Sequence, residues 1–413
     1  MVKLLIKYKH QIIIIVIGVL WLAFLNELMQ IKNQNNICND CDNYRESASY
    51  LYHNFKAHYF RPLGMAIVTG LPYLFGASDA TIYKFSLIIN ILAWLGSALL
   101  LFSFFLKQMS NYKALICTLL FYSIIGCAFI TFQLLTESIF AFLILTVFYF
   151  FEKYYKKKSF QYLSIAISLL LFTMLIKPSV KFLAILIFIY YGKTLLENYR
   201  NKSILFVYLS LTLIAFQYIK MKNDYGNYTL SYIDSVTYYN YIGSRAKFYR
   251  TNDTLNQKTN KRAEFLGKFS YPEQRIIASK DLLSQIGNNK FNLIKAYISD
   301  LYENTKAPSG SIYSWKNLED KKYFNLAYKW VIIISKYQNR FLTIIGFVLA
   351  LYYIFKSYKL DFFYSLISFY ILYTIAVSGI SCSQGDRFHI VFFPFTIILI
   401  VKFCAEKKLF NLF

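Results

Sequence analysis

The chain has 413 residues, of which 57% are apolar, 20% are aromatic and only 16% are charged. A soluble domain carries about a quarter charged residues, so this composition excludes an ordinary soluble protein and favours a polytopic membrane protein. The formal net charge of +24 does not by itself indicate nucleic-acid binding, because the location of the charges matters more than their sum. We expect no nucleic-acid partner.

Ten apolar runs are expected to form membrane-spanning helices, so the predicted fold class is all-α. A spanning helix needs about 20 mostly apolar residues. The predicted spans are 11–28, 81–106, 113–130, 134–151, 159–176, 178–192, 203–220, 340–356, 360–377 and 390–404. Asn and Gln follow the first run where a signal peptide would have small residues, so we expect a retained helix.

One further apolar segment, PLGMAIVTGLPYLFG at 62–76, is short and is broken by two prolines and three glycines. Counting it as a span would move the KKK at 156–158 to the outer side of the membrane. We therefore expect re-entrant or interfacial helices here, covered by protein.

The positions of Lys and Arg predict the orientation. With a cytoplasmic N-terminus, seventeen Lys and Arg residues lie in the inner segments, against three in the short outer loops, namely Lys177, Lys181 and Arg387. The positive-inside rule then places the N-terminus in the cytoplasm, and we expect the protein in the plasma (inner) membrane.

This topology divides the chain into three parts. The module 1–220 contains the first outer loop, 29–80; an extracytoplasmic loop domain covers 221–339; and transmembrane helices follow in 340–413. In the loop domain, SYPE at 270–273 predicts a helix start, Gly287 predicts its end, and KFNLIKAYISDLYEN predicts a second, amphipathic helix. A small, mainly helical domain is expected.

The six cysteines are weakly informative. Cys38 and Cys41 form a C-x-x-C without a second Cys or His pair to complete a zinc site. In an oxidising compartment they can form a disulfide, with Cys382 as a rival partner.

Polar residues expected at the outer membrane level are the candidates for chemistry, because charged groups there are costly and tend to mark sites. The set contains Asp40, Asp42, Arg45, Glu46, Arg61, Glu137, Lys177, Lys181, Asp386, Arg387 and His389. Each has an ordinary alternative. The aspartates can be solvated loop charges, the lysines interfacial anchors, and Glu137 a favourable carboxylate at a helix N-terminus. Arg387 can simply pair with Asp386 or extend to the membrane interface, and His389 can be a packed interface residue.

Other chemistries lack their motifs. The chain has no G-x-x-x-x-G-K-[ST], no G-x-G-x-x-G and no G-x-S-x-G, and its four histidines are too few for an evident metal cluster.

Several of these stretches together resemble the GT-C superfamily of integral-membrane glycosyltransferases. The first outer loop has the similar pattern Asp40-Cys-Asp42-Asn-Tyr44, followed by Ala48-x-x-Leu51. RPLGMAIVTGLPYLFG, LLTESIFAFLIL, LIKPSVKF and GDRFHIVFFPFTIILI are similar to later family motifs, with Met and Phe at positions where Tyr is common and one proline missing. The match covers most of 1–220 and 340–405 and leaves 221–339 uncovered.

The resemblance implies transfer of a hexosyl or pentosyl group from a polyprenyl-phosphate-linked donor to an extracytoplasmic glycan, lipid or protein. Asp40 or Asp42 is expected to be the base that takes the acceptor proton. Lys177, Arg387 and Arg61 are expected to bind the donor phosphate, with Tyr44, Glu137 and His389 in supporting roles. The cofactor is left open, although the two aspartates are suited to a divalent cation.

Two other functions remain open. An O-antigen-type polysaccharide polymerase also has about ten helices and relies on outer-loop arginines, for which Arg245, Arg250, Arg262 and Arg275 are present. A lipid-linked-sugar flippase or transporter is expected to have polar residues at mid-membrane and repeated halves, neither of which is evident.

Overall fold

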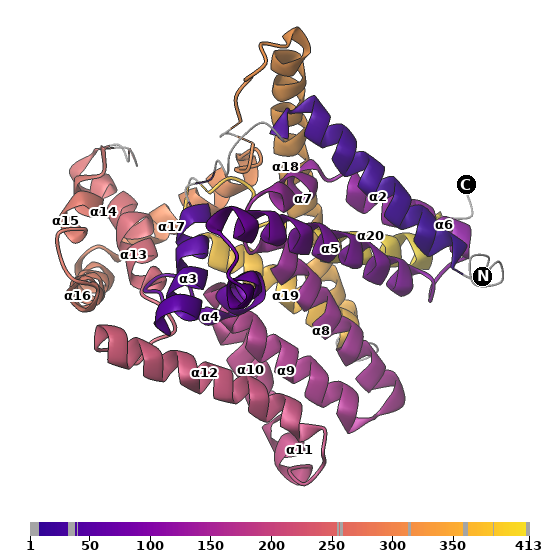
Figure 1. The fold of residues 1–413 in the computed structure, drawn as a ribbon, viewed down its shortest axis with the longest axis horizontal. Helices are drawn as coiled ribbons and strands as arrows, with labels where there is room; N and C mark the ends of the chain where they lie inside the picture. The colour runs from indigo at the N-terminus through magenta and orange to yellow at the C-terminus, as the bar shows by residue number, and fades with distance from the viewer. Residues whose placement is uncertain are drawn as a thin grey trace.

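The computed structural model describes residues 8–31, 38, 40–253, 256, 259–312, 315–357, 362–382 and 384–409. Within these ranges the secondary structure is entirely helical, and no strand is present. Figure 1 shows the helices arranged as a bundle, with α13 to α16 grouped at one end. The all-α prediction is confirmed.

The first half of the chain forms the larger part of the bundle. Its helices are α2 (Lys9–Leu28), α3 (Cys41–Asn54), α4 (Leu63–Thr69), η2 (Leu71–Phe75), α5 (Asp79–Phe105), α6 (Asn111–Tyr122), α7 (Ile125–Phe129), η3 (Ile130–Phe132), α8 (Glu137–Lys157), α9 (Phe160–Ile176), η4 (Pro178–Val180), α10 (Lys181–Tyr190), α11 (Gly192–Glu197) and α12 (Ile204–Tyr225).

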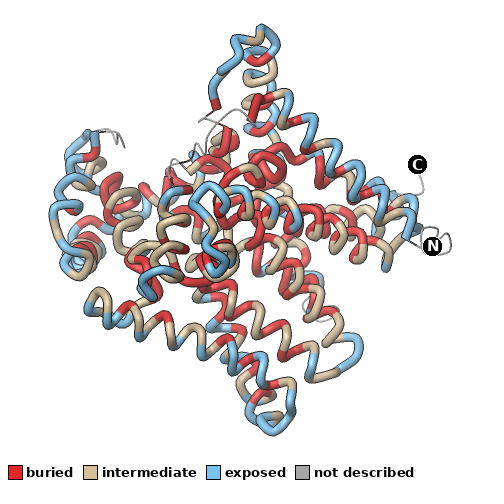
Figure 2. The backbone as a smooth tube through the Cα atoms, in the orientation of Figure 1, coloured by how far each residue is buried: buried red, intermediate tan, exposed pale blue. Residues whose placement is uncertain are grey.

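The second half contains the group of shorter helices and the C-terminal helices. They are α13 (Ile233–Asn240), α14 (Ile242–Thr251), α15 (Lys261–Leu266), α16 (Tyr271–Asn288), α17 (Lys290–Lys306), α18 (Lys322–Ser357), α19 (Phe362–Ser378) and α20 (Phe393–Glu406). Figure 2 shows that buried residues are concentrated in the middle of the bundle, whereas many residues at its outlying ends are exposed.

Five helices of the described chain are long and apolar enough to cross a membrane, and the number rises to six if one bent pair counts as a single span. These helices are α2, α5, α8, α12 and α18, together with the pair α6–η3. Helices α9, α10 and α19 are apolar but shorter. An integral membrane protein is therefore supported, while the count of ten spans stays a prediction.

The predicted span 113–130 is not one straight helix, because α6 and the segment Ile125–Phe132 meet at 71°. Ile124 between them has extended backbone angles, which end α6. Gln338 of α18 compensates for the lost helical hydrogen bonds. Its Oε1 accepts from the backbone N–H of Ile125 at 2.9 Å, and its Nε2 donates to the carbonyl of Ser123 at 2.6 Å.

The predicted span 340–356 lies within a longer helix, because α18 begins at Lys322 and so extends into the predicted loop domain. Lys322, Lys329 and Lys336 stand seven residues apart and so share one side of the helix. They lower the average hydropathy of the first half without interrupting the helix.

The first loop folds against the bundle. The disulfide Cys38–Cys41 closes the turn that leads into α3, and Cys382 is buried and outside any disulfide. The apolar segment 62–76 forms the short helices α4 and η2, too short to span. A Cβ at Gly64 would lie 2.6 Å from the backbone of Leu175, so α4 packs directly on the end of α9.

Helices α13 to α17 connect α12 to α18. Helix α16 starts at the predicted SYPE with a capping box, in which Ser270 and Glu273 satisfy each other's backbone groups. It ends at Asn288, one residue beyond the predicted Gly287. The predicted amphipathic helix is α17, although its buried face is the polar one.

Candidate functional site

Five charged residues from separate parts of the sequence meet at one end of the bundle. We call Asp40, Arg61, Glu137, Lys177 and Arg387 the ion cluster. Asp40 follows α2, Glu137 begins α8, Lys177 directly follows α9, and Arg387 precedes α20. Because these helices alternate in direction, all of these positions fall at the same end.

Asp40 is held between two arginines. Its Oδ1 accepts from Nη2 of Arg61 at 2.7 Å, and its Oδ2 accepts from Nη1 of Arg387 at 2.8 Å. Burial favours the neutral carboxyl, but the two guanidinium groups outweigh burial and hold the pKa of Asp40 below its usual range. Asp40 is therefore ionised and has both oxygens occupied.

Glu137 continues the network from the other side. Its side chain is only 1% exposed, and its Oε1 accepts from Nζ of Lys177 at 3.0 Å and from Nε of Arg387 at 3.2 Å. Burial opposes the charge of Arg387, but the carboxylates of Glu137 and Asp40 outweigh burial and raise the pKa of Arg387. Arg387 thus links both carboxylates, and Glu137 does more than complete a helix N-terminus.

Tyr44 lies one helical turn beyond Asp40 and supports Arg61. The guanidinium carbon of Arg61 lies 4.4 Å from the centre of the Tyr44 ring, and Nη1 donates to the hydroxyl at 3.4 Å. The face of an aromatic ring attracts a cation electrostatically, so the Tyr44 ring stabilises the charged guanidinium group above it. Tyr44 therefore contacts Arg61 through both its ring and its hydroxyl.

The backbone of Arg61 is held by His58, a residue that is absent from the predicted set. The Nδ1 atom of His58 accepts from the backbone N–H groups of Phe60 and Arg61, both at 3.1 Å. Its Nε2 faces Oε2 of Glu46 at 3.4 Å, so the neutral tautomer with a proton on Nε2 satisfies every contact. No local motif marks this role, since His58 is a single histidine in a loop.

The charge state of His58 follows from its surroundings. Its side chain is completely buried, the Tyr59 ring stacks on it at 4.2 Å and the Tyr50 ring lies at 5.6 Å. Burial lowers the pKa of His58 to about 4, with Glu46 acting in the opposite direction and Arg61 adding to the decrease. Above that pH, Nδ1 remains an acceptor.

The loop that carries Arg387 is fixed by Asp386, which is buried behind it. Oδ1 of Asp386 accepts from the backbone N–H of Gly310 at 3.3 Å. A Cβ at Gly126 would lie 2.1 Å from Oδ2 of Asp386, so only glycine fits there. Burial raises the pKa of Asp386 to about 7. Asp386 thus connects α7 and the segment after α17 to the Arg387 loop, and it does not pair with Arg387.

Helix α13 ends beside the same loop. The hydroxyl of Tyr241 accepts from Nε2 of Gln384 at 2.9 Å, and its pKa is raised mainly by burial, with contributions from Cys382 and Asp40. Tyr241 therefore lies close enough to the ion cluster to interact with it electrostatically. The segment 221–339, which the family motifs do not cover, therefore contributes to the surroundings of the candidate site.

Asp42 lies away from the ion cluster. Its side chain is 77% exposed, accepts from the hydroxyl of Tyr83 and lies 3.8 Å from Arg45. Arg45 in turn pairs with Asp79 at the start of α5. The two aspartates of the D-x-D do not converge, and among the described residues no group of three or more His, Cys, Asp or Glu is placed to hold a metal ion.

His389 and Lys181 also lie outside the ion cluster. Nδ1 of His389 lies 2.8 Å from Oδ1 of Asn339 and 3.1 Å from the Thr343 hydroxyl, so the ring is packed between α18 and its own loop. Lys181 pairs with Asp234 of α13. His389 is thus placed as a buried packing residue.

Two of the four arginines that the polymerase alternative singled out are engaged in internal ion pairs. Arg245 binds Asp300 at 2.8 Å and Glu303 at 2.6 Å, and Arg262 binds Asp281 at 2.8 Å. These pairs join α14 to α17 and α15 to α16. Arg245 and Arg262 therefore connect helices within the segment between α12 and α18.

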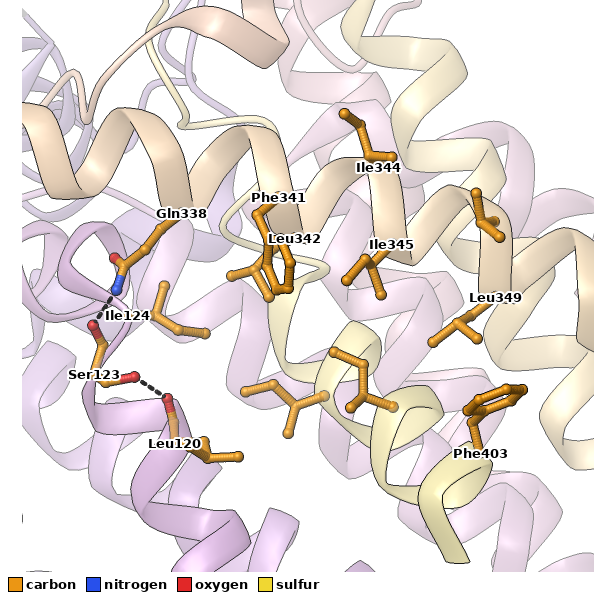
Figure 3. A pocket seen from close by; sticks show the side chains of 13 residues that line it. Leu120, Ser123, Ile124, Gln338, Phe341, Leu342, Ile344, Ile345, Leu349 and Phe403 are labelled. Atoms are coloured by element: carbon orange, nitrogen blue, oxygen red, sulfur yellow. Dashed lines mark hydrogen bonds between the residues drawn. The ribbon is translucent and has the colours of Figure 1, made fainter. Parts of the chain in front are cut away.

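An apolar cavity of about 600 Å³, open to the surface on one side, lies between α6, α18 and α20. Figure 3 shows its lining side chains, with Phe341, Ile345 and Leu349 on α18 and Phe403 on α20, and with Gln338 bonded to Ser123 at one end. That end is the bend between α6 and α7, and Gly126 of α7 touches Asp386. The cavity wall and the Arg387 loop are therefore in contact through α7.

No protein-family model matches the chain, and a comparison with curated proteins finds no significant match.

Proposed function

We propose that the chain is an integral-membrane glycosyltransferase of the GT-C type. It transfers a sugar from a polyprenyl-phosphate donor to a glycan, lipid or protein acceptor. The observation that carries the proposal is the ion cluster, in which three cations face only two carboxylates at the end of an apolar helical bundle. The surplus positive charge suits an anionic group such as a lipid phosphate.

The arrangement of the cluster supports a division of roles. Arg387 and Arg61 present guanidinium groups that bind phosphate through paired hydrogen bonds, and Lys177 adds a point charge. Sugar transfer releases a lipid phosphate, so these cations stabilise the charge that develops on the leaving group. Asp40 takes the proton from the acceptor hydroxyl.

The same contacts give a reason why Asp40 becomes an effective base only after the donor has bound. While both arginines bind Asp40, its lowered pKa makes it a weak base. A donor phosphate competes for these arginines and adds a negative charge beside Asp40, and both effects raise the basicity of the carboxylate. Asp40 is therefore most effective once the donor is bound.

The apolar cavity supports the lipid nature of the donor. Its lining is formed by aliphatic and aromatic side chains, and α7 connects it to the Arg387 loop. An isoprenoid chain is suited to this cavity, because packing hydrocarbon against its apolar lining is favourable. The donor then has its chain in the bundle and its phosphate at the bundle end.

The test uses the lipid-linked sugar that accumulates in cells lacking the protein. That lipid, purified and mixed with the protein in lipid nanodiscs and a cell-envelope acceptor fraction, should lose its sugar to the acceptor and release polyprenyl phosphate. Arg387→Ala should abolish the release. Movement of the intact lipid across vesicles without cleavage would indicate a transporter and would overturn the proposal.

A further inference from the structure

The distribution of side chains on α17 is inverted relative to a helix that faces water. Its buried residues are Ala296, Asp300 and Asn304, four residues apart on one face. Its exposed face is formed by Phe291, Ile294, Ile298 and Tyr302, all more than half exposed. At 3.6 residues per turn these four side chains fall within about 80° of arc, on the side opposite Asp300.

The polar face of α17 is buried against other helices of the protein. Nε of Arg245 lies 2.8 Å from Asp300, and Nδ2 of Asn304 donates to the carbonyls of Ser378 and Ser381 at 2.8 and 2.7 Å. These contacts fix the rotation of the helix. Phe291, Ile294, Ile298 and Tyr302 therefore cannot turn inward without breaking a buried ion pair.

Helix α18, a candidate membrane span, also buries polar side chains in the stretch from Ser335 to Thr343. Ser335, Asn339 and Thr343 are buried, whereas Tyr337 and Phe341 are exposed. Asn339 joins the two helices, since its Nδ2 donates to the carbonyls of Asn304 and Ala307 at 2.7 and 2.8 Å. A polar interior and an apolar exterior are what a helix surrounded by lipid presents.

Helix α17 also touches the end of α19. The Tyr297 hydroxyl donates to the carbonyl of Ala376 at 2.7 Å, and a Cβ at Gly379 would meet the side chains of Tyr297 and Leu301. Ile380, just beyond, is exposed. The apolar face of α17 is thus continuous with the apolar surface at the ends of α18 and α19.

We infer that α17 is an interfacial helix whose Phe291–Tyr302 face is inserted into the bilayer. Its occupants are lipid acyl chains, and the basic residues Lys290, Lys295 and Lys306 lie along the helix where anionic headgroups are within reach. The amino group of Lys306 lies 3.6 Å from the centre of the Tyr302 ring, which brings charge to the edge of the apolar face. This inference does not depend on the proposed transferase activity.

The test is nitroxide accessibility in the full-length protein, reconstituted in vesicles of phosphatidylethanolamine and phosphatidylglycerol. Cys117, Cys127 and Cys382 are buried, so a Cys404→Ser background leaves an introduced cysteine as the main labelling position. Labels are placed at Ile298→Cys and Phe291→Cys. The matched controls are Phe347→Cys on α18 for lipid and Ser284→Cys on α16 for water.

The inference predicts that labels at 291 and 298 are relaxed by oxygen and shielded from an aqueous nickel chelate, as at 347. Relaxation by the chelate to the level found at 284 would place the face in water and overturn the inference. Shielding from both reagents would show that protein, such as a second copy of the chain, covers the face, and would overturn it equally.

Discussion

Replacement of Asp40 by asparagine is the sharpest test of the proposed mechanism. The variant retains the size of the side chain but cannot accept a proton, so turnover should fall by about 100-fold or more. The amide oxygen can still accept from one arginine, while the amide nitrogen repels the other. The loss of one hydrogen bond to a charged partner should cost about 1.5–3 kcal/mol of folding free energy.

Asp42→Asn is the matched control, because it makes the same chemical change two residues away on a side chain that is 77% exposed. Exposed substitutions of this kind change stability by less than about 0.5 kcal/mol. Turnover of Asp42→Asn should therefore stay near that of the wild type. Donor affinity of Asp40→Asn should be unchanged or tighter, since the substitution releases Arg61 and Arg387 to bind the phosphate.

The assay measures release of polyprenyl phosphate under single-turnover conditions, with donor binding measured separately so that affinity and chemistry are resolved. A thermal melt in the same nanodiscs controls for folding. Normal turnover of Asp40→Asn in folded protein would refute the assignment of the base. Equal loss in both variants, with partial recovery on adding a divalent cation, would point to a metal site instead.

The other predictions concern the phosphate cations, their support and the topology. Arg387→Lys should weaken donor binding by about 10-fold or more, because one ammonium cannot bridge two carboxylates and a phosphate; unchanged affinity would contradict this role. His58→Leu should weaken donor binding by displacing Arg61, whereas His58→Asn, whose side-chain oxygen can accept in place of Nδ1, should restore part of it. In the wild type, donor affinity should fall as the pH decreases towards about 4. At that pH, His58 gains a proton on Nδ1 and can no longer accept from the Arg61 N–H. The His58→Asn variant should lack this part of the pH dependence. Impermeant maleimide added to intact cells should label Ser284→Cys and miss Lys157→Cys, and the reverse pattern would invert the predicted orientation.

The sequence alone predicted an all-helical chain, the approximate places of its long apolar helices and the clustering of several polar groups at one end of them. Apolar runs of about 20 residues can only be satisfied as helices in lipid, and charged residues are confined to the helix ends by the cost of burying them. Asp40, Glu137, Lys177 and Arg387 are therefore assigned to one level by the order of apolar runs and charges along the chain. The helical nature of the segment between α12 and α18 was equally predictable from the cap at Ser270 and its following pattern.

Tertiary structure decided which of these groups touch. Asp40 and Asp42 are two residues apart, and on a helical turn that spacing separates side chains by about 200°, so only the packing of α3 shows that Asp40 faces the arginines. The role of His58 depends on a loop geometry that no residue pattern encodes. The rotation of α17 was likewise decided by long-range partners, since Asp300 and Asn304 bind groups far away in sequence and so turn the apolar face outward. Such contacts depend on the whole chain, because each joins segments whose proximity arises only when the bundle forms.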